Sequence, residues 1–266
     1  MNPTELANCE EEYRDTLTEA AAALPQAPTG GLPYFLVELS QRVLGICALL
    51  SDADTDAFVD RLERSGTARL ELQKLPGRGV PCDTQLLTAT KAVGFPAAIA
   101  SGNLDLSAQI ARVLPDRHDP EWEYEDDFLF VDVMRRAVIG VVDGGTGWTA
   151  GARDALARWG VVLKKRKSPE RDVWVALVAQ DQSAFAGSFP AVVNHRLAQF
   201  EVYKKQPNFD SKLFAAEGHV WIEGLALLEI ATRLGLSTEP AYQLLPSLAR
   251  SQRSQRKGPN PDWLKE

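Results

Sequence analysis

The feature that most constrains the fold is an apolar period of three and four residues that runs through most of the 266-residue chain. The stretch YFLVELSQRVLGICALL (34–50) shows this period at Leu36, Leu39, Val43 and Cys47. Side chains spaced in this way lie on one face of an α-helix. The stretch therefore predicts an amphipathic helix.

The same period continues over residues 55–75, where Glu63, Arg64 and Arg69 fall between the apolar positions. Their dispersal predicts a solvated face on a second helix. Residues 214–234 are the most hydrophobic of the helical segments and predict a central helix. Glycine is costly inside a helix, so Gly218 and Gly224 predict a close crossing with a neighbouring helix. Glu229 and Arg233, four residues apart, predict a surface ion pair on this helix.

Short segments rich in helix-breaking or turn-forming residues separate the periodic stretches: 25–33, 75–83, 140–151, 164–170 and 204–210. Further helices are predicted over residues 127–139 and 150–159, with two in 83–114 and two in 172–204. Pro190 suits the first turn of the second helix in 172–204. Strand signals are poor, and the sequences VIGVV (138–142) and GVVLK (160–164) are compatible with one small β-hairpin.

Three helical joints resemble one another: CALLSDADTDAFVDRL, AAIASGNLDLSAQIARVL and VALVAQDQSAFAGSFPAV. Their unequal spacing argues against a strict tandem repeat, which needs a fixed period. We predict an all-α fold of stacked antiparallel helical hairpins, either a degenerate TPR-like array or a helical bundle. It forms one domain over residues 1–250, with N-terminal helices in 1–82 and a helical core in 83–250. Residues 251–266 predict a mobile basic tail.

Charge and composition narrow the classes of partner. Lys and Arg number 29 against 36 Asp and Glu, a net charge of −7, which argues against nucleic-acid binding and favours a basic partner. The basic run KKRK (164–167) lacks interleaved aromatic residues and predicts a loop. The N-terminus has no secretory pattern, and no apolar run approaches the roughly 20 residues of a membrane span. The three scattered cysteines predict reduced thiols and a cytoplasmic protein without a membrane partner.

No phosphate loop, dinucleotide fingerprint, nucleophile elbow or HExxH motif is present, so the sequence predicts no catalytic residues, no cofactor and no metal. His219 and Glu223 have the spacing of a pair on one helix face, and a core contact between them is favoured over catalysis. The remaining enzyme hypothesis is a metal site made by Glu217, His219 and Glu223. His195 is interpreted as an interhelical contact, and His118 as a solvated loop residue.

The acidic run DPEWEYEDDFLF (119–130) has three interpretations. A metal site ranks last, because crowded carboxylates repel one another without ligands from elsewhere. Asp126 and Asp127 suit the N-cap and first turn of a helix, and Asp132 suits an ion pair with Arg135 or Arg136. EWEYE predicts an extended surface segment in which acids and rigid aromatics could dock a basic protein. The candidate partner-binding residues are Glu121, Trp122, Glu123, Tyr124, Glu125, Asp126 and Asp127, together with the turn acids Asp52, Asp54 and Asp56.

Four stretches in this order resemble the immunity protein 49 family of bacterial polymorphic-toxin systems: AIASGNLDLSAQIARVL, YEDDFLFVDVM, VALVAQDQSAFAGSFPAVVNHRLAQF and FAAEGHVWIEGLALLEIATRLGL. The resemblance covers roughly residues 90–236. Helical immunity proteins that protect against secreted DNases are the second choice.

The resemblance implies an all-helical, cytoplasmic bacterial protein that is not an enzyme. Such a protein binds and neutralises a toxin, often a nuclease, delivered by sister or rival cells through type VI secretion or contact-dependent competition. The implied mechanism is occlusion of the toxin's active site or substrate groove by the acidic residues around 121–127. The partner would be a basic toxin encoded by an adjacent gene. The alternative hypothesis is a helical-repeat adaptor with a peptide ligand.

Overall fold

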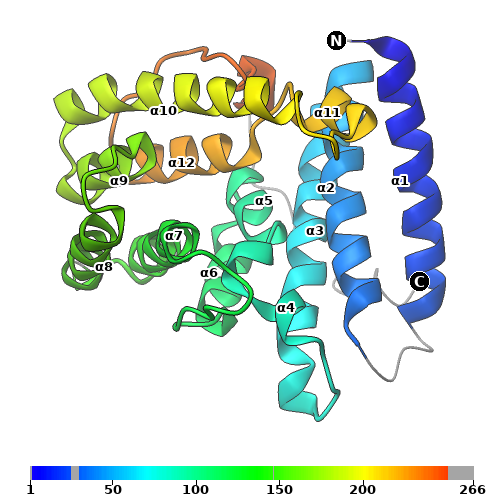
Figure 1. The fold of residues 1–266 in the computed structure, drawn as a ribbon, viewed down its shortest axis with the longest axis horizontal. Helices are drawn as coiled ribbons and strands as arrows, with labels where there is room; N and C mark the ends of the chain where they lie inside the picture. The colour runs from blue at the N-terminus through cyan, green and yellow to red at the C-terminus, as the bar shows by residue number, and fades with distance from the viewer. Residues whose placement is uncertain (1, 25–29, 146, 251–266) are drawn as a thin grey trace.

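The computed structural model describes residues 2–24, 30–145 and 147–250, and its elements are helical (Figure 1). The α-helices are α1 (Pro3–Ala23), α2 (Leu32–Asp52), α3 (Thr55–Lys74), α4 (Thr84–Leu87), α5 (Gly94–Ala100), α6 (Leu104–Val113), α7 (Glu125–Asp143), α8 (Trp148–Leu163), α9 (Pro169–Ala179), α10 (Gln182–Tyr203), α11 (Ser211–Glu217) and α12 (Ile222–Arg233). Short 3-10 helices are η2 (Pro76–Arg78), η3 (Ala89–Lys91) and η4 (Ser247–Arg250). The predicted all-α class is confirmed, whereas the predicted tail lies outside the described residues.

The three similar joints have the same backbone conformation. In each, the last helical turn is followed by a residue in the left-handed conformation: Ala53, Gly102 and Gln180. The next residue then accepts backbone N–H bonds of the following helix through its side chain, as Asp54, Asn103 and Asp181 do. An N-cap of this kind satisfies donors that a helix start leaves free. The joints connect α2 to α3, α5 to α6 and α9 to α10, as predicted.

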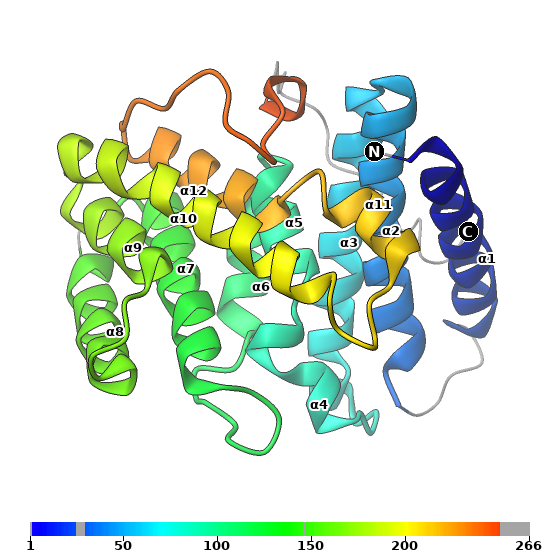
Figure 2. The ribbon, with the colours of Figure 1, turned by 45° about the horizontal axis from the view of Figure 1, so that its top comes forward.

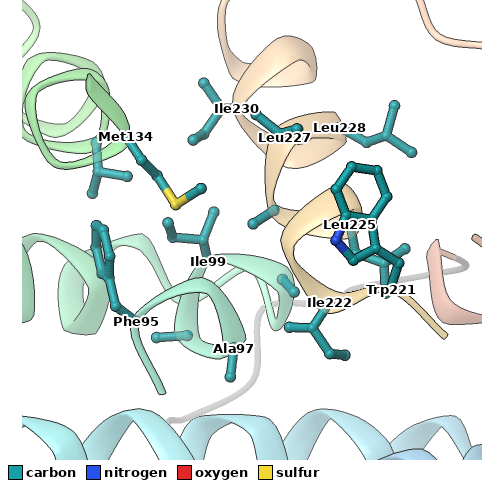
Figure 3. Close-up of a cluster of buried hydrophobic side chains, with 14 of the residues drawn as sticks. Phe95, Ala97, Ile99, Met134, Trp221, Ile222, Leu225, Leu227, Leu228 and Ile230 are labelled. Carbon is teal, nitrogen blue, oxygen red and sulfur yellow. The ribbon is translucent and has the colours of Figure 1, made fainter. Parts of the chain in front are cut away.

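Helices α1, α2 and α3 lie side by side at the right of Figure 1, and α7 to α10 lie at the left. Helix α5 stands between these groups and contacts α3 and α12, while α12 runs below α10 in Figure 1 and contacts α7. Helix α11 packs on α1 and α2. Figure 3 shows the centre, where Phe95 and Ile99 of α5 and Met134 of α7 lie beside the apolar face of α12. The short helix α5 therefore joins the two groups.

Helix α2 meets the length and composition of a membrane span, but 61% of its most apolar window is buried inside the protein. It packs between α1 and α3 (Figure 1). Two of its charged side chains are buried. Glu38 forms an ion pair with Arg69 of α3, and both side chains are fully buried. Arg42 forms ion pairs with Glu217 and Glu223. These contacts are those of a core helix.

The predicted solvated face of α3 is wrong for two of its three residues. Arg69 is fully buried and Glu63 is 7% exposed, whereas Arg64 is half-exposed. The reason is that α3 is covered by α2 on one side and by α5 and α6 on another. A period that marks one apolar face cannot show that a second face is also covered.

The predicted β-hairpin is also wrong, because residues 138–142 belong to α7 and residues 160–163 to α8. Both stretches continue the helical period of the residues before them and end at a turn. Pro190 lies inside α10 rather than in its first turn, because the helix already begins after the Asp181 cap. Its side chain is exposed to solvent there.

The predicted helix over 214–234 is interrupted between α11 and α12. Gly218 ends α11, and Trp221 is the N-cap of α12. A Cβ on Gly218 would lie 2.5 Å from the Phe214 carbonyl oxygen, and one on Gly224 would lie 2.3 Å from the Trp221 ring. A Cβ on Gly224 would also lie 2.8 Å from the Leu245 side chain, which follows α12 and belongs to no helix. Neither glycine therefore marks the predicted crossing with a neighbouring helix, and that prediction is wrong. The predicted Glu229–Arg233 ion pair is present at 2.9 Å.

We expect Glu63→Gln to stabilise the protein at alkaline pH. Burial raises the pKa of the Glu63 carboxyl to about 7, although the Asn103 amide opposes the shift. Because the folded pKa lies above the unfolded value, this group supports folding at low pH and loses that contribution as the pH rises through about 7. Glutamine keeps an acceptor for the Asn103 amide. Urea unfolding should show the variant on the order of 2 kcal/mol more stable at pH 8 and nearly unchanged at pH 4. An equal gain at both pH values would contradict this assignment.

Candidate functional site

The segment 119–124 is a compact turn, so the prediction that EWEYE is an extended surface segment is wrong about its conformation. The cause is Glu123, whose carboxylate accepts hydrogen bonds from the backbone N–H of Thr90 at 3.1 Å and of Asp119 at 3.2 Å. Its carbonyl lies 2.8 Å from His118 Nε2. These hydrogen bonds of Glu123 stabilise the turn.

His118 is half-buried rather than solvated, and its ring lies 5.8 Å from that of Phe128. The turn directs its aromatic residues outward. The Tyr124 side chain is 79% exposed and Trp122 is 38% exposed, and Glu121 is exposed beside them. Two large rings held by a hydrogen-bonded turn offer contact area at a low entropic cost.

The negative charge at the start of α7 is partly neutralised by two arginines, one in α8 and one in the loop between α8 and α9. The helix begins at Glu125, so Asp126 and Asp127 lie in its first turn, as predicted, while Tyr124 occupies the N-cap. Glu125 pairs with Arg158 at 2.6 Å, and Asp126 pairs with Arg166 at 3.2 Å. Of the three acids in the first turn of α7, Asp127 is the exposed one.

Asp127 also has a distinct electrostatic setting. Desolvation raises the pKa of its carboxyl, and the nearby charges of Asp126, Glu170 and Glu123 add to the effect. A cationic group of a partner would relieve this repulsion. Further along α7, Asp132 bonds both Arg135 and Arg136, which confirms that predicted ion pair and extends it.

The turn acids Asp52, Asp54 and Asp56 are exposed, but they lie at the α2–α3 joint. In Figures 1 and 2 this joint is at the top of the molecule, and the segment before α7 is in its lower half. Asp54 is engaged in capping α3. The ten predicted residues therefore do not form one surface.

A cavity of about 570 Å³ opens beside the start of α7, and the sequence did not indicate it. Its walls come from η3, α5, α7, α8, α9, α10 and α12, and from the basic loop before α9. Apolar walls include Phe95, Phe130, Met134, Trp159 and Trp221, of which Phe95, Met134 and Trp221 appear in Figure 3. This volume is in the usual range of pockets that bind small organic molecules.

Charged groups of both signs also line the cavity. His195 of α10 contacts Glu170 of α9 at 2.6 Å, so the predicted interhelical contact is confirmed. Burial by itself would raise the pKa of Glu223, but the guanidinium groups of Arg42 and Arg196 lower it. Glu223 thus remains ionised at neutral pH. Asp126 and Asp127 stand at the rim, which connects the cavity with the acidic turn.

The histidine pairing predicted for α12 is wrong. His219 lies in the break before α12, and Glu223 pairs with Arg42 at 2.7 Å instead. Burial lowers the pKa of His219, whose ring faces Phe214 at 6.4 Å. Glu217 is likewise bound to Arg42. Among the residues that the structure describes, no group of three His, Cys, Asp or Glu side chains is placed to hold a metal ion.

Comparisons of the chain with known protein families, with curated proteins and with solved structures found no match.

Proposed function

We propose that this protein is an immunity protein that binds a basic toxin and blocks its active site or substrate groove. The toxin would be encoded by an adjacent gene and would act as a nuclease. The protein contributes no catalysis of its own and acts in the cytoplasm. The proposal combines the family resemblance with the acidic net charge.

One observation supports this function most directly: a rigid turn presents Trp122 and Tyr124 between the exposed acids Glu121 and Asp127. Exposed aromatic rings supply much of the binding energy in protein interfaces, and flanking acids speed encounter with a basic partner. We call these four residues the acidic aromatic surface. Glu123, Glu125 and Asp126 act on this surface indirectly, because their carboxylates are bound within the protein.

We expect the double variant Glu121→Lys, Tyr124→Ala to bind the toxin about 100-fold more weakly, since it loses an anchor ring and reverses a flanking charge. Calorimetry with the product of the adjacent gene measures this loss, and rescue of cells on coexpression reports inhibition. Wild-type affinity should also fall as salt rises, because salt screens the charge attraction.

The matched control is Asp52→Lys, which makes the same charge reversal at the distant α2–α3 joint. It should change the affinity less than threefold at physiological salt, because charges further from the interface than the Debye length of about 8 Å are largely screened. Equal losses in both variants would indicate general charge attraction rather than a specific surface. Unchanged affinity of the double variant would place the interface elsewhere.

The second candidate function is a helical adaptor with a peptide ligand. It is favoured by the cavity, whose apolar and arginine side chains come from several helices. An adaptor would bind its ligand without any toxin gene beside its own and would not rescue cells from a toxin. The coexpression experiment therefore separates the two functions.

A further inference from the structure

We propose that Cys9 of α1 and Cys47 of α2 form a redox-sensitive dithiol, which hydrogen peroxide converts into a disulfide bond that ties α1 to α2. The proposal goes beyond the proposed function and does not depend on a toxin. Both thiols are free, and both side chains are fully buried. Oxidation therefore requires that α1 first moves away from α2.

The register of the two helices places these cysteines opposite each other. Helices α1 and α2 are consecutive in the chain and run antiparallel in Figure 1. Ala20 of α1 and Val37 of α2 belong to one buried cluster. Cys9 lies eleven residues before Ala20, and Cys47 lies ten residues after Val37. Because an α-helix rises about 1.5 Å per residue, both cysteines lie at nearly the same level along the helix pair.

The two thiols are in direct contact. The Cys9 thiol forms a hydrogen bond with the Cys47 thiol, and this bond, together with burial, raises the pKa of Cys9 above its ordinary value. A protonated, buried thiol reacts poorly with oxidants, so both cysteines stay reduced while α1 is in place. The third cysteine, Cys82, lies beside Gly31 at the N-terminal end of α2, whereas Cys47 lies in the last two turns of that helix.

Helix α1 is held less firmly than α2. Both helices have 21 residues, but three residues of α1 are buried against eleven of α2. The ion pair between Glu12 and Lys212 of α11 is half-exposed on both sides and contributes little. Segments with few buried contacts open locally at a lower free energy than the rest of a protein. Opening of α1 exposes Cys9 and Cys47 together.

The oxidation proceeds in two steps once α1 is open. The thiolate of one cysteine attacks a peroxide oxygen and the O–O bond breaks, which gives a sulfenic acid and a hydroxide ion that takes up the thiol proton to become water. The second thiol then attacks the sulfenic sulfur, the S–S bond forms, and the S–O bond breaks with loss of a second water. Two thiols are thereby oxidised and one peroxide is reduced to two waters. A dithiol reductant reverses the reaction by thiol–disulfide exchange.

The first test treats the full-length protein with hydrogen peroxide at neutral pH and locates disulfides by mass spectrometry of the unreduced digest. We expect a Cys9–Cys47 disulfide within one molecule in the wild type and in Cys82→Ser, and none in Cys47→Ala. In the oxidised wild type, amide hydrogen exchange in α1 should slow by at least about tenfold, because the cross-link prevents the helix from opening, while exchange in α9 stays unchanged. Thiols that stay reduced, disulfides through Cys82, oxidation to sulfonic acid without a disulfide, or unchanged exchange in α1 would each overturn the proposal.

Two cap variants test whether the reaction depends on local opening of α1. Asn2 caps α1 by accepting a hydrogen bond from the Thr4 N–H, and Asp181 caps α10 by accepting one from the Ala184 N–H. We expect Asn2→Ala to form the disulfide about fivefold faster than the wild type, the effect of one lost N-cap on a local opening equilibrium. Asp181→Ala should keep the wild-type rate within twofold. Equal acceleration in both variants would mean that the cysteines react only after global unfolding, and the proposal would fail.

Discussion

Replacing Arg69 with methionine should lower the free energy of unfolding by about 3–5 kcal/mol, because it leaves the fully buried carboxylate of Glu38 without its cation. Arg69 lies at a junction of four segments. Its guanidinium holds Glu38 at 2.6 Å and donates to the carbonyl of Leu86 at 2.8 Å, and a further bond reaches Lys91. Loss of Arg69 therefore frees both the α2 carboxylate and the backbone of segment 84–93. Urea unfolding measures the change.

The control for this prediction is Arg14→Met. Arg14 pairs with Glu10 on α1, and its side chain is 65% exposed. An exposed pair at this spacing contributes about 0.3–0.5 kcal/mol. If both variants lost similar stability, the buried pair would not have the role assigned to it. Adding Glu38→Leu to Arg69→Met should recover part of the loss, since an apolar pair removes the buried charge.

This buried pair marks the limit of what the sequence could predict about the fold. The helical period located α2 and α3 because each has one strongly apolar face. The period could not show that α5 and α6 cover a second face of α3, because that packing depends on helices that come later in the chain. Glu63 and Arg69 consequently had the sequence pattern of solvated residues. Joints were predictable because their cap residues act on the next two or three residues of the chain.

The candidate site also has features that the local sequence could predict and features that depend on distant residues. The first-turn role of Asp126 and Asp127 was predictable, since it depends on a local helix start. The inward role of Glu123 was not, because its partner Thr90 lies 33 residues earlier in the chain. The cavity could not be predicted from the sequence for the same reason, because the residues that line it are spread between Ala89 and Glu223.

Replacing Gly94 with alanine should cost about 3 kcal/mol, at the upper end of the usual range for overpacking. A Cβ at this position would lie 2.5 Å from the Ser65 carbonyl oxygen and 2.9 Å from its carbonyl carbon. Backbone atoms cannot move aside as a flexible side chain can, so α5 must shift away from α3. The Gly94 N–H also donates to Glu38, and the shift would weaken that bond.

The matched control is Gly187→Ala in α10, where a Cβ would meet no atom within 4 Å. Alanine is the better helix former, so this variant should gain about 0.5–1 kcal/mol. Urea unfolding should show a lower free energy of unfolding for Gly94→Ala and a higher one for Gly187→Ala. A loss at both positions would indicate that helix propensity is not the deciding factor.

The Gly94 variant also tests how the core determines the site. Phe95 and Pro96 follow Gly94 in α5 and line the cavity. A shift of α5 away from α3 moves both side chains and so changes the shape of the cavity, whereas the acidic aromatic surface at the start of α7 should keep its affinity for the toxin. Arg69→Met should change the cavity in the same way, because the Arg69–Glu38 pair holds the N-terminus of α5 through the Gly94 N–H.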